Sequence, residues 1–292
     1  MYDLILVPTD GSAGAEVAAR HAITLAAAFD SEVRLLSVVD DRSVSPDPEA
    51  TDPDISVVHT GFEERAQAAV DSLAELVADT GVPYETAVLT GAPAATIREY
   101  AADAGVDLIS MGTHGRTGLD RLLLGSVTER VVRTSDVPVL TSRVEPEDSA
   151  GYDRVLVPTD GSEAATVAIE HGVAIAERFD ATVHALTVIN VAGLAGAADV
   201  GPVLPDVVEA FEDQAEAAVE AVATRCEDRG VDVVTEISQG TPYRSIRSYV
   251  TDRDIDFVAM GTHGRTGLDR YLIGSVTERT VRTSEVPVLT VR

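Results

Sequence analysis

The chain has 292 residues, with 22 basic side chains, all of them arginine, against 49 Asp and Glu, so its net charge is −27 at pH 7. Such an acidic chain is not expected to bind nucleic acid or an anionic membrane, and it suits a halophilic protein, because concentrated salt screens its self-repulsion. The missing lysine excludes the lysine-dependent chemistry of Walker-A hydrolases, kinases and Schiff-base enzymes.

Short β-branched runs alternate with helical patterns along the first half of the chain. In order, the pattern predicts a strand at 4–7 ended by Pro8, a helix at 12–29 capped by Ser12, strands at 33–39 and 84–89 with a helix between them, a helix after Pro93, a strand ending at Met111, a helix from Ser126 and a strand at 137–141. This alternation predicts a parallel sheet with helices on both faces, which binds ligands at the carboxyl ends of its strands.

The second half of the chain repeats the first. The segment DLILVPTDG at 3–11 returns as DRVLVPTDG at 153–161, and the same alternation follows. The stretch 143–151, RVEPEDSAG, is polar and contains a proline, which is typical of a linker. We therefore predict two domains, 1–142 and 152–292, each large enough for its own core.

A glycine-rich stretch follows the fourth predicted strand of each half. MGTHGRTGLDR at 111–121 recurs letter for letter at 260–270, and each copy is followed by GSVTER. Glycines between a strand and a helix let the backbone approach an anion at the free N–H groups of the helix. Alternatively, the glycines only turn the chain, and Ser126 and Glu129 form a capping box. Two near-identical loops in halves that differ elsewhere favour a phosphate ligand.

Further candidate side chains are expected at the same edge of the sheet. Asp10 could accept a hydrogen bond from a ribose hydroxyl or a base amino group, or it could only cap the helix that follows. Val38 could offer backbone groups to an adenine edge. His114 has little core to join inside a glycine loop, so contact with phosphate or base is favoured. Ser126 and Thr128 would bring two hydroxyls to the start of the helix.

The other histidines, the loop arginines and the cysteine carry weaker signals. His21 and His171 lie within helices and are interpreted as packing residues, and Cys226 lies on an apolar stripe, as a buried hydrophobe would. Four loop arginines could reach phosphate or pair with carboxylates: Arg116, Arg121, Arg265 and Arg270. One cysteine, no signal peptide and no long apolar run predict a soluble, cytoplasmic protein.

These features together resemble two tandem universal stress protein domains, over essentially the whole chain except the linker. The spacing G-x-x-G, nine residues, G-S is similar to that of the family's ATP-binding branch. The resemblance implies two Rossmann-like domains of the adenine nucleotide alpha hydrolase-like type, each a five-stranded parallel sheet of strand order 3-2-1-4-5. It implies ATP as the ligand and leaves open whether Mg²⁺ accompanies it.

Positions that match the family's motif imply one set of nucleotide contacts in each domain. The residues at the end of each first strand, Pro8 and Thr9 or Pro158 and Thr159, are added to these sets. The first set is Pro8, Thr9, Asp10, Val38, Met111, Gly112, His114, Gly115, Gly125, Ser126, Val127 and Thr128. The second set is Pro158, Thr159, Asp160, Val188, Met260, Gly261, His263, Gly264, Gly274, Ser275, Val276 and Thr277.

Three functions remain open from the sequence. The favoured one is a nucleotide-dependent stress-response regulator that holds ATP. The alternative is a slow ATPase or another nucleotide-processing enzyme of the same fold; no residue is assigned as its catalytic base. The third is a structural stress protein whose loops bind nothing.

The last predicted strand of each half carries the same letters, V-P-V-L-T, at Val137–Thr141 and Val286–Thr290. Proline is tolerated at a sheet edge or at the first residues of a strand, so we expect both strands at edges. Two such edges in one chain could pair antiparallel and form an intramolecular pseudo-dimer, as the resemblance to dimeric single-domain relatives also implies. A further homodimer is left open.

Overall fold

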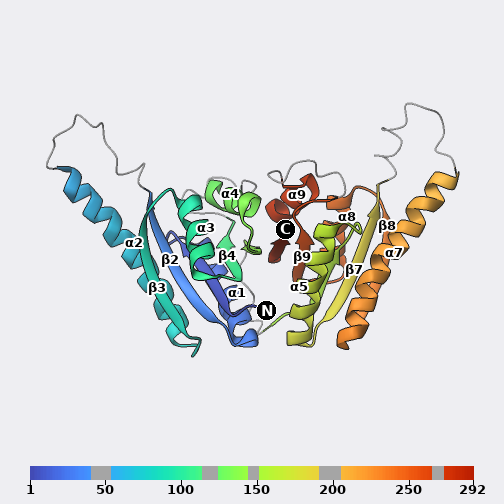
Figure 1. Ribbon diagram of the computed structural model, residues 1–292, viewed down its shortest axis with the longest axis horizontal. Coiled ribbons are helices and arrows are strands. Elements are labelled where there is room, and N and C mark those ends of the chain that lie inside the picture. Colours follow the sequence, from blue (N-terminus) through green and yellow to red (C-terminus); the bar gives the residue numbers. More distant parts are fainter. Residues whose placement is uncertain (41–53, 114–123, 144–150, 191–204, 265–272) are drawn as a thin grey trace. The chain divides into compact units, whose positions relative to one another are not determined.

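The computed structural model describes residues 1–40, 54–113, 124–143, 151–190, 205–264 and 273–292. The chain divides into two compact units, Met1–Asp148 and Ser149–Arg292 (Figure 1). The units share one architecture.

Unit 1 alternates strands and helices. Its described elements are β1 (Leu4–Thr9), α1 (Ala13–Phe29), β2 (Glu32–Asp40), α2 (Asp54–Ala78), β3 (Tyr84–Gly91), α3 (Pro93–Ala104), β4 (Leu108–Gly112), α4 (Ser126–Thr134) and β5 (Val139–Ser142). The strand order is β3-β2-β1-β4-β5, and neighbouring strands are parallel. Helices α1 and α2 pack together on one face of the sheet, and α3 and α4 on the other. The predicted fold class is therefore confirmed.

Unit 2 repeats this arrangement. Its described elements are β6 (Arg154–Pro158), α5 (Glu163–Phe179), β7 (Thr182–Ile189), α7 (Pro205–Arg229), β8 (Val233–Gln239), α8 (Pro242–Asp252), β9 (Phe257–Gly261), α9 (Ser275–Thr283) and β10 (Val288–Val291). Its strands follow the order β8-β7-β6-β9-β10 and are again parallel. In Figure 1, α8 lies beside α9, and the two helices are in contact.

The core of each unit is centred on its first strand. Ile5, Leu6 and Val7 in β1 are fully buried, as expected for a parallel strand covered by helices on both faces. Tyr2, which precedes β1, packs edge-to-face on Phe29 at the end of α1, with ring centroids 5.0 Å apart. Unit 2 repeats the pair with Tyr152 and Phe179 at the same separation. Burial of these apolar surfaces supplies the main stabilisation of the two units.

Pro8 does not end the first strand of unit 1, which the structure extends to Thr9, whereas Pro158 is the last residue of β6 in unit 2. In unit 2, the N–H of Thr159 faces β7 and donates to the carbonyl of Leu186 (2.9 Å), so the preceding Pro158 faces β9. The ladder between β6 and β9 ends two residues earlier, at Leu156. The missing N–H of the proline therefore lies where the two strands have separated, and a proline is tolerated near the middle of the sheet.

The fifth strands begin later than predicted, at Val139 and Val288 rather than Val137 and Val286. A proline precedes each strand. The carbonyl of Pro138 accepts a hydrogen bond from the N–H of Ile109 (2.9 Å), so the proline joins the ladder through its acceptor alone.

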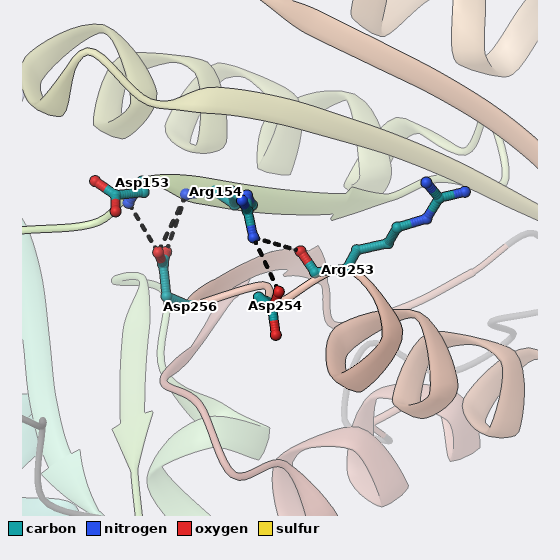
Figure 2. A network of polar contacts seen from close by, with 5 residues as sticks. All are labelled: Asp153, Arg154, Arg253, Asp254 and Asp256. Carbon is teal, nitrogen blue, oxygen red and sulfur yellow. Dashed lines mark hydrogen bonds and ion pairs between the residues drawn. The ribbon is translucent and has the colours of Figure 1, made fainter.

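Carboxylate side chains hold the amino-terminal end of β6 (Figure 2). The carboxylate of Asp256 accepts hydrogen bonds from the N–H groups of Asp153 (2.8 Å) and Arg154 (3.2 Å). The guanidinium of Arg154 donates to the carbonyl of Arg253 (3.0 Å) and contacts Asp254 (3.4 Å). These contacts tie β6 to the turn that leads into β9.

Candidate functional site

Unit 1 contains a cavity of about 270 Å³ at the carboxyl ends of β1, β2 and β4. Its lining includes ten of the twelve residues predicted for this domain; the other two, His114 and Gly115, lie outside the described residues. The full lining is Pro8, Thr9, Asp10, Ser12, Ala15, Leu36, Val38, Pro93, Ile97, Met111, Gly112, Gly125, Ser126, Val127 and Thr128.

The lining combines apolar and polar residues. Leu36, Val38, Ile97 and Met111 supply apolar walls, and Asp10 is the one charged side chain among the lining residues. Residues at the first turn of α4 also line the cavity. Such a cavity can hold a flat apolar group at one end and an anion at the helix end.

The turn from β1 into α1 places Asp10 at the rim. Gly11 has φ 77°, a left-handed conformation that glycine adopts without strain. The Asp10 carboxylate accepts the N–H of Ser12 (3.0 Å), and the Ser12 hydroxyl accepts the N–H of Ala15 (3.3 Å) as the helix N-cap. The cap of α1 is therefore Ser12, whereas Asp10 fixes the turn before the helix and also lines the cavity.

Gly112 ends β4 against the first turn of α1. A Cβ at Gly112 would lie 2.4 Å from the carbonyl carbon of Gly14 and 3.0 Å from the nitrogen of Ala15. Both neighbours are backbone atoms, which cannot rotate away as a side chain could. This glycine is therefore required for close backbone packing, a role that the phosphate-loop interpretation did not include.

The start of α4 differs from the capping box that the sequence left open as an alternative. The N-cap is Gly125, without a side-chain cap, and Ser126 is the first helical residue. The Gly125 N–H donates to the carbonyl of Thr113 (2.8 Å), which fixes the entry of the helix. The next three N–H groups, of Ser126, Val127 and Thr128, have no carbonyl one turn earlier within the helix. They are the donors that an anion at this end of the cavity would meet.

The two hydroxyls expected at this helix start are not equivalent. The hydroxyl of Thr128 donates to the carbonyl of Gly112 (2.8 Å) and is buried, whereas Ser126 is exposed. Thr128 therefore joins α4 to the end of β4, and Ser126 is the hydroxyl placed to meet a ligand.

Unit 2 builds the equivalent region from the same residue types. Each of the fifteen lining residues of unit 1 has an identical counterpart, namely Pro158, Thr159, Asp160, Ser162, Ala165, Leu186, Val188, Pro242, Ile246, Met260, Gly261, Gly274, Ser275, Val276 and Thr277. The supporting contacts also recur. Thr277 donates to the carbonyl of Gly261 (2.8 Å), and Gly274 donates to that of Thr262 (2.7 Å).

The structure describes the start of the glycine loop in unit 2. A Cβ on Gly264 would come 2.7 Å from the Asp160 carboxylate, so the loop backbone lies directly against that side chain. Nδ1 of His263 is hydrogen-bonded to the hydroxyl of Thr262 (2.9 Å). Its Nε2 is buried without a hydrogen-bond partner in the described part of the chain. The four loop arginines lie outside the described residues.

The backbone at Val38 lies beyond the end of the first strand. The β1–β2 ladder ends at the pair Thr9–Ser37, and β2 continues to Asp40. Alternate residues of a parallel strand direct both backbone groups to the same neighbour. In unit 2, Leu186 faces β6, so the N–H and carbonyl of Val188 also face that side, next to the cavity residues.

The remaining titratable candidates are packing residues. His21 lies buried in α1, and burial lowers its pKa to about 4. Cys226 is buried in α7, as predicted, and burial raises the pKa of its thiol to about 11. Over the described ranges, no group of three or more His, Cys, Asp or Glu side chains is placed to hold a metal ion.

The prediction from the sequence missed five lining residues: Ser12, Ala15, Leu36, Pro93 and Ile97. Each is identical in the second half of the chain, where most other positions differ. Identity between the repeats was therefore the signal that could have found them.

Fold and site together define a protein of two tandem Rossmann-like α/β domains, each with its candidate site at the carboxyl ends of the strands. The model of the "Universal stress protein family" matches residues 1–143 and 151–292. The chain belongs to the universal stress protein family, in a two-domain form.

Known relatives agree with this assignment. A universal stress protein of Methanocaldococcus jannaschii is 35% identical over 141 residues, which cover 48% of this chain and 82% of that protein. One of Mycolicibacterium smegmatis is 28% identical over 299 residues, covering 99% of this chain and 96% of that protein. A crystal structure from Archaeoglobus fulgidus matches 99% of this chain and 96% of its own with a TM-score of 0.72 at 22% identity, which supports the fold alone.

None of the helices that the structure describes has the length and apolar character needed to span a membrane.

Proposed function

We propose that each domain binds one adenine nucleotide, with ATP as the favoured ligand, and that the protein is a nucleotide-dependent regulator of a stress response. The observation that carries the proposal is the doubled lining. All fifteen residues around the cavity of unit 1 recur in unit 2, in halves that differ at most other positions. Packing alone would not require identity at every rim position, including the exposed Ser126 and Ser275.

The chemistry of the lining matches the parts of a nucleotide. An adenine ring would lie against apolar lining residues such as Val38 and Ile97, and its edge would meet the backbone of Val38 beyond the end of β1. The Asp10 carboxylate can accept ribose hydroxyls. The first-turn N–H groups of α4 and the Ser126 hydroxyl suit phosphate.

The described cavity would hold only part of such a ligand. Its volume of about 270 Å³ is near the lower end of the roughly 300–1,000 Å³ that is usual for ligand pockets. The phosphates would extend toward the glycine loop. In unit 2, the buried Nε2 of His263, which has no described partner, gives that loop a further group to offer a ligand.

A magnesium ion would depend mainly on the phosphates. No described cluster of three or more acidic or histidine side chains supplies a ready site, and Mg²⁺ commonly uses one or two carboxylates together with substrate phosphates. Asp10 is the carboxylate that this lining offers.

Analysis of bound small molecules tests the proposal. The chain is purified without added nucleotide and denatured, and the released molecules are identified by mass spectrometry. We expect an adenine nucleotide in amounts approaching two per chain. Incubation with ATP and Mg²⁺, followed by product analysis, separates a regulator from an enzyme, since sustained turnover would favour a slow ATPase. Purified chain that carries no nucleotide and takes none up would contradict the proposal.

We also propose that the two domains pair through their fifth strands. Each strand lies at one end of its own domain's strand order, and each follows a proline. Replacing Val139 and Val288 with aspartate should separate or unfold the domains, whereas a charge change on an exposed helix position should not. Small-angle scattering of the wild-type chain that fits two independently moving lobes would contradict the pairing.

A further inference from the structure

Two guanidinium groups meet one aromatic ring at the start of α8. The guanidinium carbon of Arg279 lies 4.7 Å from the ring centroid of Tyr243, and that of Arg244 lies 5.8 Å from it. Nε of Arg244 also donates a hydrogen bond to the Tyr243 hydroxyl (2.9 Å). Cation–π contacts hold both positive charges at this ring.

The cluster is positive, and it has no acidic partner among the residues that the structure describes. Neither Arg244 nor Arg279 forms an ion pair with any carboxylate that the structure describes, although the chain carries 49 Asp and Glu. The hydrogen bond from Arg244, together with the charges of Arg244 and Arg279, lowers the pKa of Tyr243. Both arginines are exposed, so an anion in solution can reach them.

The cluster lies on α8 and α9, the two helices that supply Pro242 and Ser275 to the candidate site of unit 2. Tyr243 and Arg244 directly follow Pro242, the counterpart of a cavity-lining residue. Arg279 lies four residues after Ser275 on α9, so the two share one helix face. Helical side chains lean toward the helix N-terminus. The Arg279 guanidinium therefore lies between the start of α9 and the Tyr243 ring at the start of α8, which it contacts.

Unit 1 lacks most of this cluster. Tyr243 and Arg244 are replaced there by Ala94 and Ala95, and Arg130 stands where Arg279 does. The fifteen lining residues are the same in the two units, so this rim is a difference between sites that are otherwise alike.

We propose that Tyr243, Arg244 and Arg279 form a phosphate-binding rim that makes the unit 2 site prefer nucleoside triphosphates over monophosphates more strongly than the unit 1 site does. The proposal rests on the proposed nucleotide function. The terminal phosphates of a triphosphate, which extend past the helix N-terminus, would meet the two guanidinium groups, whereas a monophosphate would end before reaching them. Guanidinium groups favour phosphate oxygens as partners.

A reciprocal exchange between the units tests the rim in the full-length chain. Gly125→Val or Gly274→Val silences one site, and calorimetry gives the affinities for ATP and AMP at the other. We expect the ratio of ATP to AMP affinity to be on the order of fivefold higher at unit 2, which is a modest effect for exposed charges. Tyr243→Ala with Arg244→Ala should lower that ratio to the unit 1 value. Ala94→Tyr with Ala95→Arg should raise it in unit 1.

A matched variant controls for charge. Arg253→Ala removes one arginine from the opposite end of the same helix, where its partner is Glu236, and should leave the ratio unchanged. Equal ratios at the two sites, or a ratio that the exchange does not move, would overturn the rim while leaving the nucleotide sites intact. Absence of binding at both sites would overturn the rim and the proposed function together. Circular dichroism and hydrogen exchange establish that each variant is folded.

Discussion

Replacing Gly112 with alanine should destabilise unit 1 and distort its site. The new Cβ would lie 2.4 Å from the carbonyl carbon and 2.5 Å from the carbonyl oxygen of Gly14, and both of these neighbours are backbone atoms. Overpacking of this kind costs about 1–3 kcal/mol, and more where the neighbours cannot move. Gly261→Ala in unit 2 should cost less, since its Cβ would come no closer than 2.8 Å to Ala164.

Calorimetry of the full chain is the suitable assay, because the sequence has no tryptophan for fluorescence. Hydrogen exchange should then locate the loss of protection in α1 and β4 for Gly112→Ala. Gly61→Ala is the matched control, because nothing lies within 4 Å of its added Cβ, and a helical Gly→Ala change should stabilise by about 0.5–1 kcal/mol. If Gly112→Ala melted with the wild type, the close approach of β4 to α1 would be wrong.

Three further results are expected. Thr128→Val should lower the free energy of unfolding by about 1–2 kcal/mol, because it leaves the Gly112 carbonyl without its hydrogen-bond donor. Thr277→Val should have the same effect in unit 2. Calorimetry that finds both variants as stable as the wild type would rule out these hydrogen bonds. Burial lowers the pKa of His21 from 6.5 to about 4 in the folded chain. As the pH falls below 6.5, the unfolded chain therefore takes up a proton at this histidine before the folded chain does. The folded state should lose up to roughly 3 kcal/mol of stability between pH 6.5 and pH 4 from this group. A His21→Met chain should lose less over that range, and equal losses would refute this origin. Because the net charge is −27, the melting temperature should rise from low to molar potassium chloride, and a flat response would contradict the predicted salt requirement.

The fold was predictable because its signals are local and occur twice. Alternating apolar strands and amphipathic helices gave the parallel sheets, and Ser12 acts as the N-cap that its residue type suggested. The boundaries failed where an interaction was not local. Pro8 stays within β1 because its missing N–H faces the gap between β1 and β4, which only the strand order creates.

The candidate site was predictable in its residues and less so in their roles. Gly112 and Thr128 were predicted as ligand contacts, and both line the cavity. Each also has a structural role that was not predicted, because Gly112 permits the approach of α1 and Thr128 ties α4 to β4. The sequence does not reveal that the backbone at the end of β4 touches the backbone of the first turn of α1, about 100 residues earlier in the chain. Pro93 and Ile97 were missed because they lie on α3, which reaches the cavity only through packing over the sheet.

The stoichiometry of ATP binding tests the central claim most directly. Titration calorimetry of the full chain should give two sites for the wild type. Gly125→Val should leave one site, Gly274→Val should leave the other, and the double variant should leave none, because valine at either N-cap crowds the first-turn N–H groups. Added ATP at about 100 times its dissociation constant should stabilise each binding-competent domain by about 2.7 kcal/mol. One site in the wild-type chain would contradict the claim that both domains bind, and a folded wild-type chain with no heat of binding would contradict the account as a whole.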